Sequence, residues 1–268
     1  ITFGELMLRL SPDNNERFTQ AHSYEAVYGG GEANTAVSLA NFNVDTRYVT
    51  KLPNHTIGQS AVNSLRQYGV DVSRIVRGGD QIGIYFLEKK TSQRPTNVIY
   101  NRNGSAFALA TKEDFDWNSI FEGATWFHFS GITPAISDNM AEITIEACKE
   151  AKKRNITVSC DLNYRSKLWS SEKANKVMSE VCKYVDICIA NEDDAVGIFG
   201  MDASKSDKEK NAYIAEELTK MFPNFKMVAS VWRTETSITT FKLQSMIYTD
   251  GKAYYSQEFF MNILDYIG

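Results

Sequence analysis

The sequence predicts an α/β fold with a doubly wound, mostly parallel sheet and helices on both of its faces. From residue 125 onward, short apolar runs alternate with amphipathic helical segments, which is typical of parallel sheets covered on both sides. Ribbon-like runs in the first hundred residues do not fit this alternation and predict a small additional β-sheet. The length of 268 residues suits one sizeable soluble domain, here predicted to span residues 1–268.

In the first half, the hydrophobic pattern predicts mostly strands with two helices. We expect strands at residues 1–10, 23–28, 44–52 and 71–77, helices after the glycine run at 29–31 and at 58–68, and a hairpin of 81–88 with 96–102.

In the second half, strands and helices alternate regularly. We expect strands at residues 125–130, 156–162, 186–190 and 226–231, and helices at 138–154, 172–184 and 212–222. One apolar face of helix 138–154 should be buried: Met140, Ile143, Ala147, Cys148 and Ala151. Asp250-Gly251 predicts a tight hairpin turn.

Composition disfavours several classes of function. The net charge is −4 and no strong basic cluster is present, so a nucleic-acid partner is not expected. No run approaches the roughly 18 apolar residues of a membrane span, and no signal peptide is visible, so we expect a cytoplasmic protein without membrane contact. Four scattered cysteines without C-x-x-C spacing predict buried, reduced thiols: Cys148, Cys160, Cys182 and Cys188.

The run Gly29-Gly30-Gly31 immediately precedes a predicted helix. Bare backbone at a helix N-terminus, with its free N–H groups, suits the close approach of a small polar ligand. Asn34 lies in the first turn and can both donate and accept hydrogen bonds. A tight strand-to-helix crossover that needs glycine only for packing is an equally good interpretation, and the stretch alone leaves both open.

Polar side chains follow two predicted strands of the parallel sheet, where ligands of such sheets bind. Asp161, Asn163 and Arg165 would project to one side if the extended conformation continued, which suits an anionic or polyhydroxy ligand. The alternative is a loop salt bridge between Asp161 and Arg165.

The next strand runs into Asn191-Glu192-Asp193-Asp194. Acidic residues at a helix start commonly serve as caps and offset the helix dipole, which is the better interpretation of this segment taken alone. Beside a phosphate site they could instead hold magnesium through water.

The early hairpin places Tyr85, Tyr100 and Arg102 on one side of a ribbon. Arg102 could fork onto a carboxylate with two parallel hydrogen bonds. Ordinary cross-strand pairs on an exposed face are the alternative. His128, inside an apolar run, is interpreted as a core histidine rather than a catalyst.

These residues resemble the ribokinase family of sugar kinases, and within it the branch that acts on 2-keto-3-deoxygluconate. Tyr85 and Tyr100-Asn101-Arg102 point to that branch. The other motifs that carry the resemblance are Thr2-Phe3-Gly4-Glu5, Gly29 to Asn34, Ser130-Gly131-Ile132-Thr133-Pro134, Asp161-Leu162-Asn163-Tyr164-Arg165 and Asn191-Glu192-Asp193-Asp194.

The resemblance implies a ribokinase-like core with a small β-sheet lid, inserted at about residues 12–29 and 80–103. It also implies ATP-dependent phosphorylation of a primary hydroxyl, with Mg²⁺, that converts 2-keto-3-deoxygluconate to its 6-phosphate. The residues expected to bind the substrate are Gly30, Gly31, Asn34, Tyr85, Tyr100, Arg102, Asp161 and Asn163, with Arg102 near the carboxylate.

On the phosphate side, Arg165 would lie between the substrate and the transferring phosphate as the catalytic residue. Asn191 would serve the phosphates, and Glu192 and Asp194 would hold Mg²⁺ indirectly through water. Asp265 and Gly268 match the first Asp and first Gly of the family's late D-x-x-G-A-G-D-like motif and would also contact the nucleotide phosphates.

The sequence departs from the family pattern at both ends. The general-base Asp is expected beyond Gly268, so the C-terminal part of the fold is missing and the chain should bind sugar better than it turns it over. Glu5-x-x-x-Arg9 stands where many relatives carry an early Asp that contacts the sugar. Residues 232–243 lack a glycine-punctuated nucleotide loop, so no adenine contacts are assigned.

Two alternative functions remain open at this level. One is a kinase for a neutral sugar such as fructose or ribose, and the other is a non-catalytic sugar-binding protein on the same fold. The strand edges of the lid could pair with another subunit, so a homo-oligomer is expected.

Overall fold

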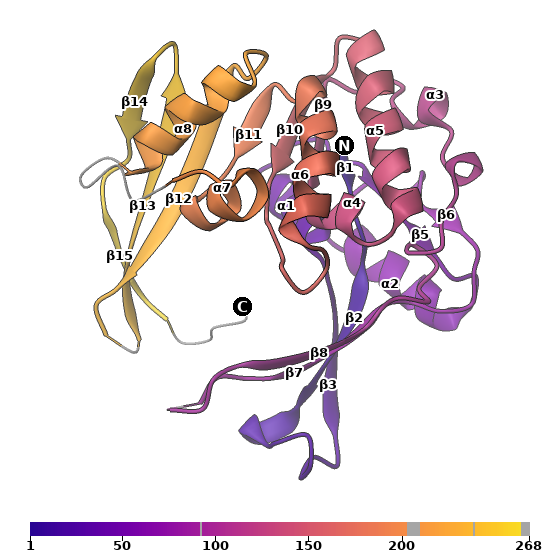
Figure 1. Ribbon diagram of the computed structural model, residues 1–268. Coiled ribbons are helices and arrows are strands. Elements are labelled where there is room, and N and C mark those ends of the chain that lie inside the picture. Colours follow the sequence, from indigo (N-terminus) through magenta and orange to yellow (C-terminus); the bar gives the residue numbers. More distant parts are fainter. Residues whose placement is uncertain (92, 203–209, 238, 264–268) are drawn as a thin grey trace. The chain divides into compact units, whose positions relative to one another are not determined.

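The computed structural model describes residues 1–91, 93–202, 210–237 and 239–263. The chain divides into two compact units, a first unit of residues Ile1–Glu122 and a second unit that begins at Gly123 (Figure 1). In this described part of the chain, no helix has both the length and the apolar character needed to cross a membrane. That the chain forms a single domain remains a prediction.

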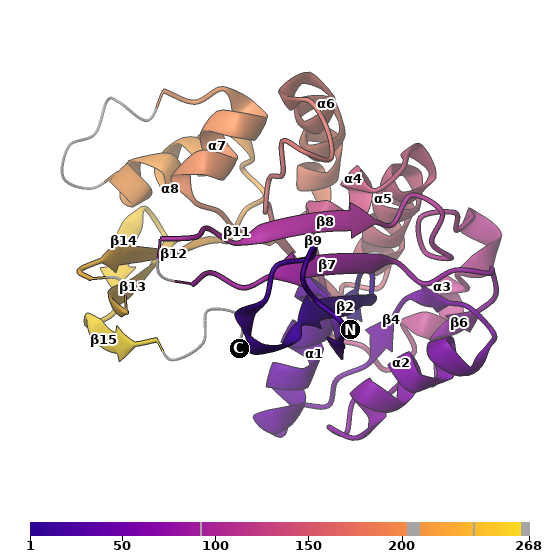
Figure 2. The same ribbon diagram turned by 90° about the horizontal axis from the view of Figure 1, so that it is seen from below.

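The first unit contains a small sheet of four strands in the order β3-β2-β7-β8. Figure 2 shows β2, β7 and β8 of this sheet side by side. Strand β2 is antiparallel to β3 and parallel to β7, and β7 and β8 form the predicted hairpin. The four strands of this small sheet are β2 (Met7–Pro12), β3 (Tyr24–Gly29), β7 (Ile84–Glu88) and β8 (Asn97–Asn101).

The single strand predicted at residues 1–10 is wrong. Residues Thr2–Phe3 form β1, which pairs in parallel with β4 (Tyr48–Val49), whereas β2 belongs to the small sheet. The chain leaves one sheet for the other between these strands, at Gly4 to Leu6. The polar Glu5 interrupts the apolar pattern at this point, because its side chain has a buried partner described below.

The first unit has an apolar core that includes Leu6, Ala36, Tyr48 and Leu65, and several further elements. They are the parallel pair β5 (Lys51–Leu52) and β6 (Val76–Arg77), the helices α1 (Gly31–Asn41), α2 (Thr56–Arg66) and α3 (Trp117–Ile120), and the 3₁₀ turns η1 (Asp13–Asn15) and η2 (Lys112–Asp114).

The second unit is built on strands that run in parallel in the order β9-β10-β11-β12, followed by antiparallel β13. Strands β14 and β15 both pair with β13. These strands are β9 (Trp126–Ser130), β10 (Thr157–Asp161), β11 (Ile187–Ile189), β12 (Met227–Glu235), β13 (Thr240–Thr249), β14 (Lys252–Tyr255) and β15 (Phe259–Asn262). The predicted α/β class, with a large mostly parallel sheet and a small separate sheet, is confirmed.

Helices of the second unit follow the predicted alternation with the strands. Helix α5 packs on β10, and α8 packs on β12 and β13. The helices are α4 (Ile132–Ala135), α5 (Asp138–Lys153), α6 (Ser171–Val181), α7 (Glu192–Phe199) and α8 (Lys210–Met221), with the 3₁₀ turn η3 (Cys182–Tyr184). The five α5 residues predicted to be buried are all inaccessible to solvent.

Two smaller predictions about the second unit are also confirmed. The four cysteines are free and buried, and burial raises the pKa of the Cys148 and Cys182 thiols, so these groups stay protonated. Asp250 and Gly251 both have positive φ, 50° and 74°, as a two-residue type I′ hairpin turn between β13 and β14 requires.

His128 on β9 is a packed histidine with a hydrogen-bond partner, as predicted. Its Nδ1 lies 2.9 Å from the hydroxyl of Ser159, which also accepts a hydrogen bond of 2.7 Å from Nε1 of Trp126. Burial lowers the His128 pKa to about 4, because the charged imidazolium would lose its hydration. The ring is therefore neutral near pH 7.

The low pKa of His128 predicts how stability depends on pH. Between its folded pKa of about 4 and its ordinary value near 6.5, only the unfolded chain binds the proton, so stability should rise with pH across this window. The full effect is about 3 kcal/mol. Urea unfolding at several pH values should show this slope in the wild type and a flatter one in His128→Asn. An unchanged slope in His128→Asn would contradict the assignment.

Candidate functional site

The glycine run joins β3 to α1, and its members have different neighbours. Gly29 ends β3, Gly30 is the N-cap of α1 and Gly31 is the first helical residue. A Cβ on Gly30 would overlap the backbone carbonyl of Glu5, whereas a Cβ on Gly31 would meet no atom within 4 Å. Packing therefore explains Gly30 but not Gly31, which leaves open space beside the helix N-terminus.

Asn34 and Tyr85 lie together beside this run. A Cβ on Gly29 would lie 3.6 Å from Oδ1 of Asn34 and 3.8 Å from the Tyr85 hydroxyl. Asn34 comes from the first turn of α1, and Tyr85 comes from β7 of the small sheet. The fold of the first unit thus brings two of the predicted substrate residues to the glycines, although they are far apart in the sequence.

A polar row crosses the small sheet at Tyr85. The strand register places Arg9, Tyr85 and Tyr100 opposite one another, so their side chains share one face. The two tyrosine rings stack with centroids 5.8 Å apart. Burial raises the pKa of Tyr85, and the neighbouring positive charge of Arg9 opposes that rise. Arg102 extends the row, with its guanidinium carbon 5.8 Å from the centre of the Tyr100 ring.

Arg102 is held by a buried carboxylate. Its Nε donates a hydrogen bond of 2.8 Å to Oε2 of Glu5, and its Nη2 contacts the same oxygen. The Ser105 hydroxyl donates to the other oxygen, Oε1, at 2.5 Å. Arg102 and Glu5 are only 7% and 5% exposed. The Nε and Nη2 atoms of Arg102 therefore bind Glu5, and Nη1 is the nitrogen that can face a ligand.

Glu5 was not among the predicted site residues. Burial raises its pKa, and the charge of Arg102 and the hydrogen bonds from Ser105 and Arg102 act in the opposite direction. A Cβ on Gly83 would come within 2.6 Å of Oε1 of Glu5, so the small sheet leaves room for this carboxylate at a glycine. The sequence did carry two signals, a carboxylate inside an otherwise apolar segment and its position where many relatives have an early Asp, but neither pointed to Arg102 as its partner.

In the second unit, three of the motifs meet at the carboxyl ends of β9, β10 and β11. The Gly131 N–H donates to the Asp161 carbonyl at 2.7 Å, and the Tyr164 N–H donates to Oδ1 of Asp194, also at 2.7 Å. This second bond ties the segment that carries Arg165 to the first turn of α7. The structure thus places the Asp161–Arg165 and Asn191–Asp194 segments beside each other.

The predicted alignment of Asp161, Asn163 and Arg165 on one side of an extended strand is wrong. Strand β10 ends at Asp161, and Asn163 has a φ of 40° in the left-handed region, which asparagine tolerates better than most residues. Arg165 is exposed, and its Nη1 donates to the carbonyl of Tyr164 at 2.9 Å.

The first turn of α7 is a capping box, as the simpler interpretation of its sequence predicted. The Asn191 side chain accepts from the Asp194 N–H at 2.9 Å, and Oδ2 of Asp194 accepts from the Asn191 N–H at 3.1 Å. Burial raises the pKa of Asp194, and its two hydrogen bonds from backbone N–H groups oppose that rise. Both carboxylate oxygens of Asp194 therefore accept hydrogen bonds from the protein backbone.

The acids of α7 differ in how well they fit a magnesium ion. Glu192 has a half-exposed carboxylate, paired with Lys210 at 2.8 Å, and this fits an indirect contact through water better than Asp194 does. Over the described ranges, no group of three or more His, Cys, Asp or Glu side chains is placed to hold a metal directly. The predicted phosphate residues Asp265 and Gly268 lie outside the described residues.

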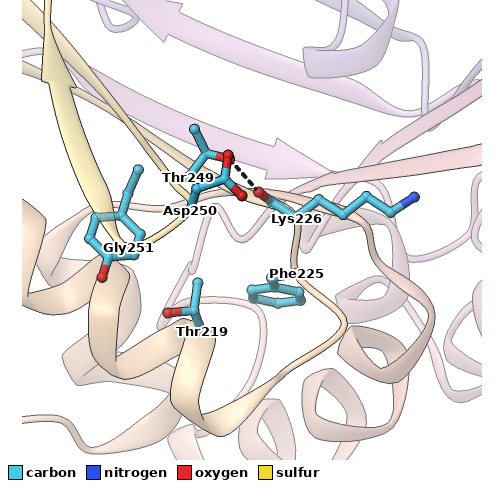
Figure 3. A pocket seen from close by; sticks show the side chains of 7 residues that line it. Thr219, Phe225, Lys226, Thr249, Asp250 and Gly251 are labelled. Carbon is cyan, nitrogen blue, oxygen red and sulfur yellow. Dashed lines mark hydrogen bonds between the residues drawn. The ribbon is translucent and has the colours of Figure 1, made fainter.

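A separate cavity of about 510 Å³ lies at the opposite edge of the second unit's sheet, where β12 begins. Figure 3 shows Thr219 and Phe225 facing it, with the hydrogen bond of 2.9 Å from the Thr249 hydroxyl to the Lys226 carbonyl at its rim. Tyr248 of β13 and Asp250 and Gly251 of the hairpin turn complete the lining. None of the predicted site residues that the structure describes contributes to this cavity.

Comparisons with known proteins agree with the motifs. A family model described as "pfkB family carbohydrate kinase" matches residues 1–224. The chain is 46% identical to the solved 2-dehydro-3-deoxygluconokinase of Thermotoga maritima, with a TM-score of 0.93, over 98% of this chain and 80% of that one.

Two curated relatives are similar over shorter ranges. A 2-dehydro-3-deoxygalactonokinase of Haloferax volcanii is 37% identical over 204 residues, 75% of this chain and 63% of that protein. A 2-dehydro-3-deoxygluconokinase of Bacillus subtilis is 28% identical over 174 residues, 64% of this chain and 53% of that protein. The chain thus spans less than two thirds of the length of these curated relatives.

Proposed function

Because the chain belongs to the pfkB family of carbohydrate kinases, we propose that it serves the ATP-dependent phosphorylation of a 2-keto-3-deoxy sugar acid at its primary hydroxyl. The first candidate is 2-keto-3-deoxygluconate, and the galactonate epimer is the second, since relatives named for each are similar to this chain. The observation that supports an acid best is a buried arginine, Arg102, whose guanidinium lies over the ring of Tyr100, which in turn stacks on Tyr85.

The residues of the first unit would bind and orient the sugar acid. The N-terminus of α1, with open space at Gly31, offers backbone N–H groups to hydroxyls, and Asn34 and Tyr85 can donate or accept beside it. Arg102 would direct its free edge at the carboxylate, because Glu5 fixes the other edge. Orientation of this kind is most of what a kinase must supply, since phosphoryl transfer depends on positioning and charge stabilisation.

The second unit would serve the phosphate side. Arg165, on a segment tied to α7 through Asp194, would offset charge on the transferring phosphate. Mg²⁺, held through water near Glu192, supplies further neutralisation of phosphate charge when bound. A general-base Asp beyond Gly268 remains part of the proposal.

The test of this function is the selectivity of Arg102→Ala. Loss of charged hydrogen bonds to a carboxylate should weaken binding of 2-keto-3-deoxygluconate by about 2–3 kcal/mol, roughly 30- to 150-fold, while fructose binding changes little. Calorimetric titration with both sugars measures the difference, and ATP consumption over a panel of sugar acids and neutral sugars measures turnover. The matched control is Arg102→Ala combined with Glu5→Gln, which removes the unpaired buried carboxylate.

Equal losses for the acid and for fructose would contradict the carboxylate role of Arg102 and favour a neutral-sugar kinase. Sugar binding without ATP consumption by the natural protein would favour the non-catalytic alternative. A homo-oligomer through the small sheet also remains a proposal, supported by the edge positions of β3 and β8.

A further inference from the structure

The charge of Arg102 is already compensated within the protein. Glu5 contacts it through two of its nitrogens, and both side chains are more than nine-tenths buried. A neutral pair of this kind can direct hydrogen bonds at a carboxylate, but it contributes little net attraction for an anion. A further positively charged residue on this face of the small sheet would therefore add the attraction for an acid that the pair lacks.

Arg9 is that residue. It is 8% exposed on β2, and the carboxylate paired with it, Glu25, is 4.0 Å away and half-exposed. Glu25 is also shared with Lys89, whose Nζ lies 3.8 Å from the same oxygen. One exposed carboxylate at these distances compensates a buried guanidinium far less than Glu5 compensates Arg102.

Arg9 is also incompletely hydrogen-bonded. Within the described part of the chain, its Nε is buried without a hydrogen-bond partner, and so is the hydroxyl of Ser11. The two residues are two positions apart on β2 and share a face of the small sheet. Buried polar atoms usually have hydrogen-bond partners. Two buried atoms without such partners on one face therefore indicate that a ligand or an ordered water molecule binds to them.

The position of Arg9 relates it to the proposed sugar site. Arg9 is paired with Tyr85 across the sheet, its charge acts on the Tyr85 hydroxyl, and that hydroxyl lies beside Gly29 and Asn34. The Arg9 side chain thus lies on the same face of the small sheet as the tyrosine that adjoins the glycine run.

We propose that Arg9 is a second cationic contact for the sugar acid, supplying the net positive charge that the Glu5–Arg102 pair lacks. The inference rests on the proposed function, since it assigns part of the recognition of that acid. Arg102 then provides directed hydrogen bonds, and Arg9 provides the charge that distinguishes an acid from a neutral sugar.

Calorimetric titration of the 268-residue chain with 2-keto-3-deoxygluconate and with fructose tests this. Arg9→Met should raise the Kd of the acid about 10-fold or more and leave that of fructose within about 2-fold. Arg9→Lys keeps the charge but loses the planar fork, and should cost only a few-fold. The control Lys89→Met removes the other cation near Glu25 and should change the Kd of the acid by less than about 2-fold.

Salt dependence separates a charge contact from a structural role. The Kd of the acid should rise with ionic strength in the wild type and in Arg9→Lys, and should respond less in Arg9→Met. Acid affinity and salt dependence that match the wild type in Arg9→Met would overturn the inference. If Arg9→Met fails to fold, an Arg9→Lys variant that loses acid and fructose affinity equally, or loses the salt dependence, would overturn it instead.

The wild-type titration distinguishes failure of this inference from failure of the proposed function. A wild-type chain that binds no sugar acid contradicts the function itself. A wild-type chain that binds the acid, with an Arg9→Met variant that binds it equally well, contradicts only the role of Arg9.

Discussion

Replacement of Glu5 by Met should destabilise the protein by about 3–5 kcal/mol, because it leaves the Arg102 guanidinium buried without its counter-charge. Both side chains are more than nine-tenths buried, and the Ser105 hydroxyl would lose its acceptor as well. Methionine is larger than glutamate and leaves no cavity, so the loss reflects the missing carboxylate rather than lost packing volume. Urea unfolding at neutral pH measures the difference in the free energy of unfolding.

Two matched variants locate the cause. Glu5→Gln keeps an oxygen that can accept from Nε of Arg102 and should cost roughly half as much as Glu5→Met. Glu122→Met removes the carboxylate of an exposed pair in the same unit, 3.6 Å from Arg74, and should change stability by less than about 1 kcal/mol. A Glu5→Met variant as stable as Glu122→Met would show that the buried pair does not hold this part of the fold.

The Glu5–Arg102 pair also shows why the sequence predicts some of the site and not the rest. The partners are 97 positions apart, and no local pattern connects them. Tyr85 and Tyr100 could be assigned to one face because strand periodicity is local and the hairpin pairs them directly. The shared face was therefore predictable, but the carboxylate that holds Arg102 was not.

The same distinction explains the outcome for the fold. The second unit repeats strand and helix at short range, so its order followed from hydrophobic periodicity. The strand predicted at residues 1–10 failed because β1 and β2 have different, distant partners, and periodicity cannot choose between two sheets. The alternation of residues predicted that the extended conformation continues from Asp161 to Arg165. A single residue in the left-handed region, Asn163, ends it instead.

Gly30 and Gly31 should respond in opposite ways to the same substitution. Gly31→Ala should fold normally and be slightly more stable, by up to about 1 kcal/mol, because alanine favours the helix that Gly31 begins. Gly30→Ala should lose several kcal/mol, because the new Cβ would overlap the carbonyl oxygen of Glu5 and the backbone there cannot move cheaply.

The binding result for Gly31→Ala carries the larger consequence. A methyl group in the open space beside the α1 N-terminus should weaken binding of 2-keto-3-deoxygluconate roughly 10- to 200-fold, the range for one carbon too many in a fitted site. Thermal unfolding and calorimetric titration of the same samples separate stability from affinity. If Gly31→Ala retains both its stability and its affinity for the sugar acid, no ligand occupies the open space beside Gly31. If it loses stability as Gly30→Ala does, the whole run serves only the crossover from β3 to α1. A ligand that lies against Gly31 requires that Gly31→Ala keeps its stability and loses its affinity for the sugar acid. In that case Gly30 is needed for packing and Gly31 is needed for binding.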